Sequence, residues 1–331
     1  MSTHPAPRFA ARLNSFRVRE REYWPGRNGK ATTLDLVERA ARVRGLNCVD
    51  LNYPDHLVTY DERQLIDAMG ALGVSLNGYA MRYYDNEGFK LGAFTHPDAK
   101  IRREAIDLTK RGIDSLSAAG GRLMTLWMGQ DGFDYSFQAD YRRLWDQTLD
   151  AIREIAEHNR AIDVSIEYKP NEPRSFSLMP NVTSTLLAIR EIGRPNLGVT
   201  LDFAHVLYAD EMPAYAAALV ARNSRLLGVH LNDGYAKRDD GLMVGAVHPI
   251  QTLELFYVLK QVGYDGAIYF DTFPDTTGLD PIAECEANIA TVAALRAAAA
   301  RLENDEALRR AIDNQDAVAA LPIVRRALYG V

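Results

Sequence analysis

Short apolar runs alternate along the chain with longer segments in which hydrophobic residues recur every three or four positions. The runs have the length of β-strands, and the longer segments have the period of amphipathic helices. Strands are expected at 9–16, 46–51, 74–79, 122–127, 163–168, 197–202, 226–231 and 267–271, and helices at 33–44, 62–72, 98–119, 141–159, 181–192, 212–221 and 252–262. Strands that alternate with helices form βαβ units and a parallel sheet.

Glycines stand at the ends of several of these helices. Gly45, Gly73, Gly120 and Gly263 each precede an expected strand, as is typical of helix C-termini. About eight strand–helix units fit a closed barrel better than an open sheet. An open dinucleotide-binding sheet would also carry a Gly-rich phosphate turn, and the sequence has neither that turn nor a P-loop. We predict a (β/α)8 TIM barrel over residues 1–300 and a charged, Ala-rich helical extension over 301–331.

Charge and composition narrow the range of partners. The 331 residues carry a formal net charge of −6, whereas binding to nucleic acid or to an anionic membrane needs a clustered basic face. No run approaches the roughly 18 consecutive apolar residues of a membrane helix, and the N-terminal segment lacks the apolar core of a secretory signal. We therefore expect a cytoplasmic protein whose C-terminal extension contacts a neighbouring subunit in a homo-oligomer, a dimer or a tetramer.

Ionisable residues follow one another at the expected strand ends. Glu167, Asp202, His230 and Asp271 close four consecutive strands, and in a parallel barrel such ends meet at the face where active sites lie. Carboxylates so close together raise one another's pKa, so a cation is expected to hold them. Three carboxylates and one imidazole suit Mn2+, Mg2+ or Co2+ better than a metal that prefers thiolates. The pattern predicts one divalent-cation site.

Two further residues are candidates for the same face. Lys169 lies two positions beyond Glu167, and residues two apart in a strand share a face. Lys169 is therefore expected to point toward the same opening. His248 precedes a proline after the loop that contains Asp239, and it is a candidate substrate contact.

Several motifs match a known family. The segment EYKPNEPR at 167–174 resembles the EPKPNEPR signature of the shorter xylose isomerases. The stretches FKLGAFT at 89–95, WMGQDG at 127–132 and YDG leading to FD at 264–271 resemble other parts of that family, in the same order. The wider superfamily of xylose isomerase-like barrels also contains tagatose-type 3-epimerases and AP endonucleases.

The resemblance implies roles for individual residues. Glu167 and Asp271 fall on ligands of the structural metal, and Lys169 falls on the lysine that polarises the sugar carbonyl. His205 and Asp239 fall on ligands of a second, mobile metal. Substrate contacts are implied for Trp127, His205, Tyr84, Asn52 and Glu172.

Three positions depart from the xylose isomerase pattern. Asn52 stands where the family has the histidine that opens the sugar ring. His56 is a candidate substitute for that histidine, although it lies four positions further along the chain. Gly241 stands where the second metal would have an aspartate. His230 replaces an aspartate, and a histidine there is typical of the single-metal site of tagatose-type epimerases.

Two routes for moving hydrogen between adjacent carbons remain open. A hydride shift between two cations is favoured by Lys169 and Asp239, and proton transfer beside one cation is favoured by His230 and Gly241. We expect a divalent-metal-dependent aldose–ketose isomerase that acts on a small free sugar by a metal-assisted hydride shift. The alternatives are a sugar 3-epimerase or a related proton-abstracting enzyme such as a C-glycoside lyase and, more distantly, an AP endonuclease-like DNA repair enzyme.

Overall fold

The computed structural model describes residues 7–83 and 86–330. Eight parallel strands form a closed barrel in the order β1-β10-β9-β8-β6-β4-β3-β2. Their bounds are β1 Phe9–Arg12, β2 Cys48–Tyr53, β3 Ser75–Met81, β4 Leu123–Trp127, β6 Asp163–Glu167, β8 Leu197–Asp202, β9 Leu226–Leu231 and β10 Ile268–Phe270. Two short strands outside the barrel, β5 (Gly132–Phe133) and β7 (Phe176–Ser177), pair antiparallel. The predicted TIM barrel is confirmed.

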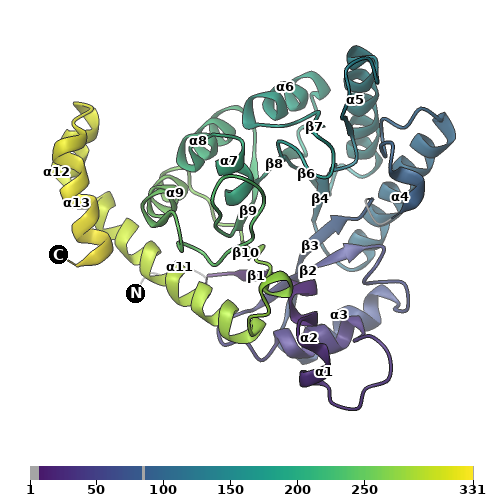
Figure 1. Cartoon of the computed structure of the whole chain (residues 1–331), viewed down its shortest axis with the longest axis horizontal. Coiled ribbons are helices and arrows are strands. Elements are labelled where there is room, and N and C mark those ends of the chain that lie inside the picture. Colours follow the sequence, from purple (N-terminus) through teal and green to yellow (C-terminus); the bar gives the residue numbers. More distant parts are fainter. Residues whose placement is uncertain (1–6, 84–85, 331) are drawn as a thin grey trace.

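Helices surround these strands (Figure 1). The longer ones are α2 Thr33–Ala40, α3 Glu62–Ala71, α4 Ala99–Ala118, α5 Tyr141–His158, α6 Val182–Ile192, α8 Pro213–Asn223, α9 Pro249–Gln261 and α11 Pro281–Glu303. Short turns are η1 Leu13–Arg17, α1 Glu20–Tyr23, η2 Glu87–Phe89, α7 Phe203–Tyr208 and α10 Pro274–Thr277. Side chains such as Asp61, Asp98 and Asp140 accept hydrogen bonds from the first backbone N–H groups of their helices, which fixes where those helices begin. None of the described helices is long and apolar enough to cross a membrane.

The interior of the barrel is closed at one end and open at the other. Ala10, Cys48, Ala267 and Tyr269 form a buried cluster of their own, separate from the large apolar core that joins the strands to the helices. Three of these four side chains are small, as the narrow interior requires. The space above them, toward the C-terminal ends of the strands, is left for polar side chains.

The structure corrects one expected boundary and shows where another falls. The first strand ends at Arg12 rather than at residue 16, because the chain turns over the end of β10, where the Ser15 hydroxyl donates to the Thr272 carbonyl at 2.8 Å. The expected division at residue 300 falls inside α11, which continues to Glu303. The glycines predicted to end helices do adopt positive φ, as at Gly45 (93°) and Gly263 (70°).

The C-terminal extension consists of α12 (Glu306–Asp313) and α13 (Ala317–Tyr329). The two helices lie to one side of the barrel, beyond α11 (Figure 1). Helix α13 packs against α9, α11 and α12, yet none of its residues is buried. The extension is therefore helical, as predicted.

Candidate active site

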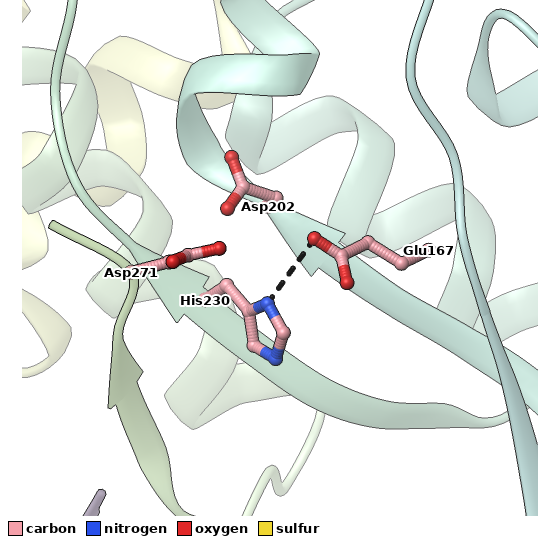
Figure 2. A group of neighbouring side chains, drawn as sticks. All are labelled: Glu167, Asp202, His230 and Asp271. Atoms are coloured by element: carbon pink, nitrogen blue, oxygen red, sulfur yellow. Dashed lines mark hydrogen bonds and ion pairs between the residues drawn. The ribbon is translucent and has the colours of Figure 1, made fainter. Parts of the chain in front are cut away.

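Four side chains converge at the C-terminal end of the barrel. Glu167 ends β6, Asp202 ends β8, His230 lies near the end of β9, and Asp271 directly follows β10. Each offers one ligand atom, and these atoms all lie within 4.8 Å of one another. Figure 2 shows the four side chains pointing toward a common centre, with Glu167 and Asp271 entering from opposite sides. The structure thus brings together the four residues that the strand ends predicted as ligands.

The chemistry of this cluster fits a divalent cation. Burial and the neighbouring carboxylates raise the pKa of Asp202 to about 7, and burial also raises the pKa of Asp271. The charges within the cluster therefore oppose one another unless a positive group lies between them. Oxygen donors with one imidazole are ligands that Mn2+, Mg2+ and Co2+ accept. Among the described residues, this is the one group of three or more His, Cys, Asp or Glu side chains that could hold a metal ion.

Asn232 fixes the orientation of the Asp202 carboxylate and holds the backbone of Asp271. Its side-chain amide donates to Asp202 at 3.2 Å (Oδ1) and 3.1 Å (Oδ2) and to the Asp271 carbonyl at 3.2 Å. Its carbonyl oxygen accepts from the Ala204 backbone N–H at 2.8 Å. Supporting contacts of this kind orient metal ligands and tune their affinity. Our sequence reasoning missed Asn232, although it lies two residues beyond His230 and so shares its face of the strand.

Asp202 also serves the fold directly. Its Oδ1 accepts from the His205 backbone N–H at 3.0 Å and so caps α7, the short helix that follows β8. Glu167 is held by His230, whose Nδ1 lies 3.3 Å from Glu167 Oε1. The ligand atoms are therefore positioned by the local structure on both sides of the cluster.

A network of charged groups stands beside the cluster. The Lys169 ammonium lies 2.9 Å from Glu172 Oε2 and 3.1 Å from Asp239 Oδ2, and His205 Nε2 lies 3.1 Å from the same Asp239 oxygen. Burial opposes the charge on Lys169, but Asp239 and Glu172 outweigh it and raise its pKa. Lys169 therefore remains an ammonium, and it faces the ring of Trp127 at 5.5 Å.

This network contains His205 and Asp239, which the resemblance implies as ligands of a second metal. His205 and Asp239 do lie together, but they are joined to each other and to Lys169. Near them, Gly241 adopts a φ of 57°, and a β-carbon there would lie 2.3 Å from the ring of Phe273. A larger residue at position 241 would therefore require Phe273 to move.

These groups line a cavity of about 320 Å³. Aromatic side chains, among them Trp127, Tyr269 and Phe273, form part of its wall. Gly129 allows the Trp127 indole to lie against the following turn, because a β-carbon at position 129 would lie 2.5 Å from that ring. The volume is at the lower end of the range for small-molecule sites.

Three other residues that the sequence predicted for the site are not among the described residues that line the cavity. Asn52 is buried and shares the inward face of β2 with Cys48, but it does not line this cavity. His248 is anchored by Asp233, with 2.8 Å between its Nδ1 and Asp233 Oδ1, and it too does not line the cavity. Tyr84 lies outside the described residues.

His56 is held in a neutral form. Its Nδ1 accepts from the Asn52 backbone N–H at 2.9 Å, and its Nε2 lies 3.0 Å from Asn14 Oδ1. Burial, with the nearby Arg82, lowers its pKa to about 3. A group with these properties takes up no proton near neutral pH and does not replace the ring-opening histidine.

Three cavity residues escaped the sequence analysis. Arg12 lies 3.9 Å from Asp271 and 2.8 Å from Asp275, so it adds positive charge beside the cluster. Arg82 and Asp50 line the same cavity. Arg12 ends β1, Asp50 lies within β2, and Arg82 directly follows β3, so these residues do not share one position at successive strand ends as the four cluster residues do.

Comparisons with known proteins agree with this architecture. The family described as xylose isomerase-like TIM barrel matches residues 37–312. A xylose isomerase from Thermus thermophilus is 27% identical over 215 residues, which are 63% of this chain and 56% of that relative. The match thus spans little more than half of the relative's length.

Solved structures show the same barrel. An L-ribulose 3-epimerase matches with a TM-score of 0.66 and 16% identity, covering 94% of this chain and 98% of the other. A xylose isomerase domain protein from Alicyclobacillus acidocaldarius matches with a TM-score of 0.65 and 18% identity, covering 89% and 100%. A D-psicose 3-epimerase from Clostridium cellulolyticum H10 matches with 0.64 and 15%, covering 81% and 94%. At these identities the likeness establishes a shared fold.

Proposed function

The chain belongs to the xylose isomerase-like TIM-barrel family, and we propose that it interconverts an aldose and a ketose among small free sugars with one divalent cation. The observation that carries the proposal is the four-residue cluster, which opens into the same cavity as Lys169 and Trp127. That cavity combines charged groups for sugar oxygens with an aromatic wall for the carbon chain, as a site for one small sugar requires.

We assign the cation, Mn2+, Mg2+ or Co2+, to Glu167, Asp202, His230 and Asp271. When bound, it supplies a Lewis acid that polarises the sugar carbonyl and stabilises negative charge on its oxygen. The chain's own residues support the same charge: Lys169, kept protonated, donates a hydrogen bond to a sugar oxygen. The aromatic wall excludes water, which strengthens these interactions.

Proton transfer is the route that we favour over the hydride shift. A second cation would have to compete for Asp239, whose Oδ2 already accepts from Lys169 and faces His205. Glu167 and Asp271 enter from opposite sides (Figure 2), and a carboxylate oxygen on either side could remove a proton from one carbon and return it to the next. Because His56 takes up no proton, we propose a substrate whose open-chain form arises without a ring-opening base.

Epimerisation at carbon 3 is the second candidate function. It requires acid–base groups on both faces of the substrate, because a proton leaves one face and returns to the other. The opposed placement of Glu167 and Asp271 favours it (Figure 2). The two functions share the cation and Lys169, and they differ in the product.

The test is a screen of free pentoses, hexoses and branched sugars with each of the three cations in deuterated water, followed by NMR. We expect an aldose and a ketose to interconvert, with solvent deuterium at the transferred position. A product that differs only in configuration at carbon 3 would favour the second function. A product free of solvent deuterium would support the hydride shift instead, and no turnover of any sugar would overturn the proposal.

Lys169→Met separates the role of the ammonium from that of the cation. We expect turnover to fall by at least about a hundredfold, because a group that stabilises developing charge is lost, while Mn2+ affinity measured by calorimetry stays unchanged. The matched control is Lys260→Met, on the surface of α9. Unchanged turnover in Lys169→Met would contradict the assigned role.

A further inference from the structure

A carboxylate without a part in the proposed reaction lies across the cavity from the metal cluster. Asp50 is on β2, which is four strands from β8 in either direction round the barrel. It is 4% exposed and lines the same cavity as Asp271. The register pairs Asp50 with Arg12, and it pairs the preceding Ala11 with Phe270, the residue before Asp271. Asp50 and the cluster thus face each other at a similar height.

The backbone is shaped around this carboxylate. Between Val49 and Asp50 the pairing with β3 shifts by one residue, which leaves Asn77 without a partner on β2. A bulge of this kind redirects a side chain, and the Asn77 amide donates to Asp50 Oδ1 at 2.7 Å. The next residue is Gly78, where a β-carbon would lie 2.6 Å from the Leu123 carbonyl oxygen. The close approach of β3 to β4 at the bulge therefore requires a glycine.

Asn77 is oriented from its other side as well. Arg8 donates to Asn77 Oδ1 at 3.1 Å, so the NH2 group of the amide faces Asp50. The second oxygen of Asp50 accepts no hydrogen bond from any of the residues that the structure describes. This oxygen is not one of the fully buried atoms that lack a partner, so it is open to the cavity that Asp50 lines. The contacts of Asn77 therefore account for only one of the two oxygens of Asp50.

We propose that Asp50 is the second anchor of the substrate. Its unmatched oxygen accepts hydrogen bonds from hydroxyl groups at the end of the sugar remote from the cation. This inference rests on the proposed function, because it needs a polyhydroxylated ligand in the cavity. Two anchors on opposite sides of the barrel select the length and configuration of the carbon chain between them, which makes Asp50 a determinant of specificity.

Unreactive polyols test the anchor without relying on turnover. Calorimetry with xylitol, ribitol and sorbitol compares Mn2+-loaded wild type with Asp50→Asn, which keeps the shape and removes the charge. We expect polyol affinity to fall about ten- to a hundredfold, the range for a hydrogen bond to a charged group, with Mn2+ affinity unchanged. The control is Cys48→Ala, on the same face of β2, which should leave both affinities unchanged.

A polyol that lacks one terminal hydroxyl distinguishes a direct contact from altered packing. Wild type should bind it about tenfold more weakly than the parent polyol, and Asp50→Asn should discriminate little between the two. Equal polyol affinity in wild type and Asp50→Asn, or equal discrimination, would overturn the anchor and leave the proposed function intact. If no polyol binds the loaded wild type and no sugar is turned over, both proposals fail.

Discussion

The two halves of the barrel mouth are built on different principles. The half formed by β6, β8, β9 and β10 gathers three carboxylates and a histidine whose ligand atoms lie within 4.8 Å of one another. The half formed by β1, β2, β3 and β4 spreads its polar groups apart, with Asp50 held by an amide and Trp127 lining the wall. Concentrated charge needs an ion, whereas spread groups suit the separate hydroxyls of a sugar. Under the proposed function, the first half therefore serves catalysis and the second half serves recognition of the sugar.

The largest effect is expected when a proposed metal ligand is removed from the first half. In His230→Ala we expect the cation to be lost and turnover to fall more than about a hundredfold, beyond the usual effect of losing a supporting contact. Metal content by mass spectrometry and turnover with the active sugar provide the measurements. His248→Ala is the matched control, because that histidine pairs with Asp233 outside the cavity. If the His230→Ala variant kept its full metal content, His230 would not be a metal ligand.

A smaller effect is expected from the support of the ligands. Asn232→Ala should lower cation affinity about ten- to a hundredfold, because the Asp202 carboxylate and the backbone carbonyl of Asp271 lose their common hydrogen-bond donor. Titration with Mn2+ monitored by calorimetry measures the change. Asn196→Ala is the control: Asn196 is equally buried, but it donates to the Ala156 and Ile162 carbonyls at the other end of β8. Equal loss in both variants would point to a general effect on folding instead.

The smallest effect is expected for the second half, where His56 makes the folding stability depend on pH. The folded chain keeps His56 neutral, with a pKa of about 3 against an ordinary value of 6.5. Below pH 6.5 the unfolded chain therefore binds a proton that the folded chain does not, so stability decreases as pH falls through this window. His56 should contribute a loss of about 2 kcal/mol between pH 7 and pH 5.

Urea unfolding at pH 7 and pH 5 measures this contribution. His56→Gln should lose less stability between the two pH values than wild type does. His158→Gln, at a partly exposed position paired with Asp114, is the control for replacing a histidine. An identical loss in wild type and His56→Gln would show that His56 is not held neutral.

The sequence was most informative where the signal is local. Strand and helix periods, with glycines such as Gly73 and Gly120 at helix ends, predicted the barrel. A ligand at the end of each successive strand predicted the cluster of Glu167, Asp202 and His230, because parallel strands bring their ends together by topology alone. No three-dimensional information was needed for either inference.

The second half could not be predicted in the same way. Asp50 reaches its position through a bulge opposite Asn77, and bulges depend on strand pairing that the sequence does not display. The neutral state of His56 depends on its burial and on Arg82, which is 26 positions away. The engagement of Asp239 by Lys169 joins segments 70 positions apart. Each of these features arises from contacts between distant parts of the chain.

The ring of Phe273 restricts what position 241 can hold. A β-carbon at position 241 would lie 2.3 Å from that ring, and the same ring lies under the guanidinium of Arg12 at 4.9 Å. A side chain at position 241 would therefore push the ring away from Arg12, so a substitution of Gly241 and the contact between Phe273 and Arg12 are coupled.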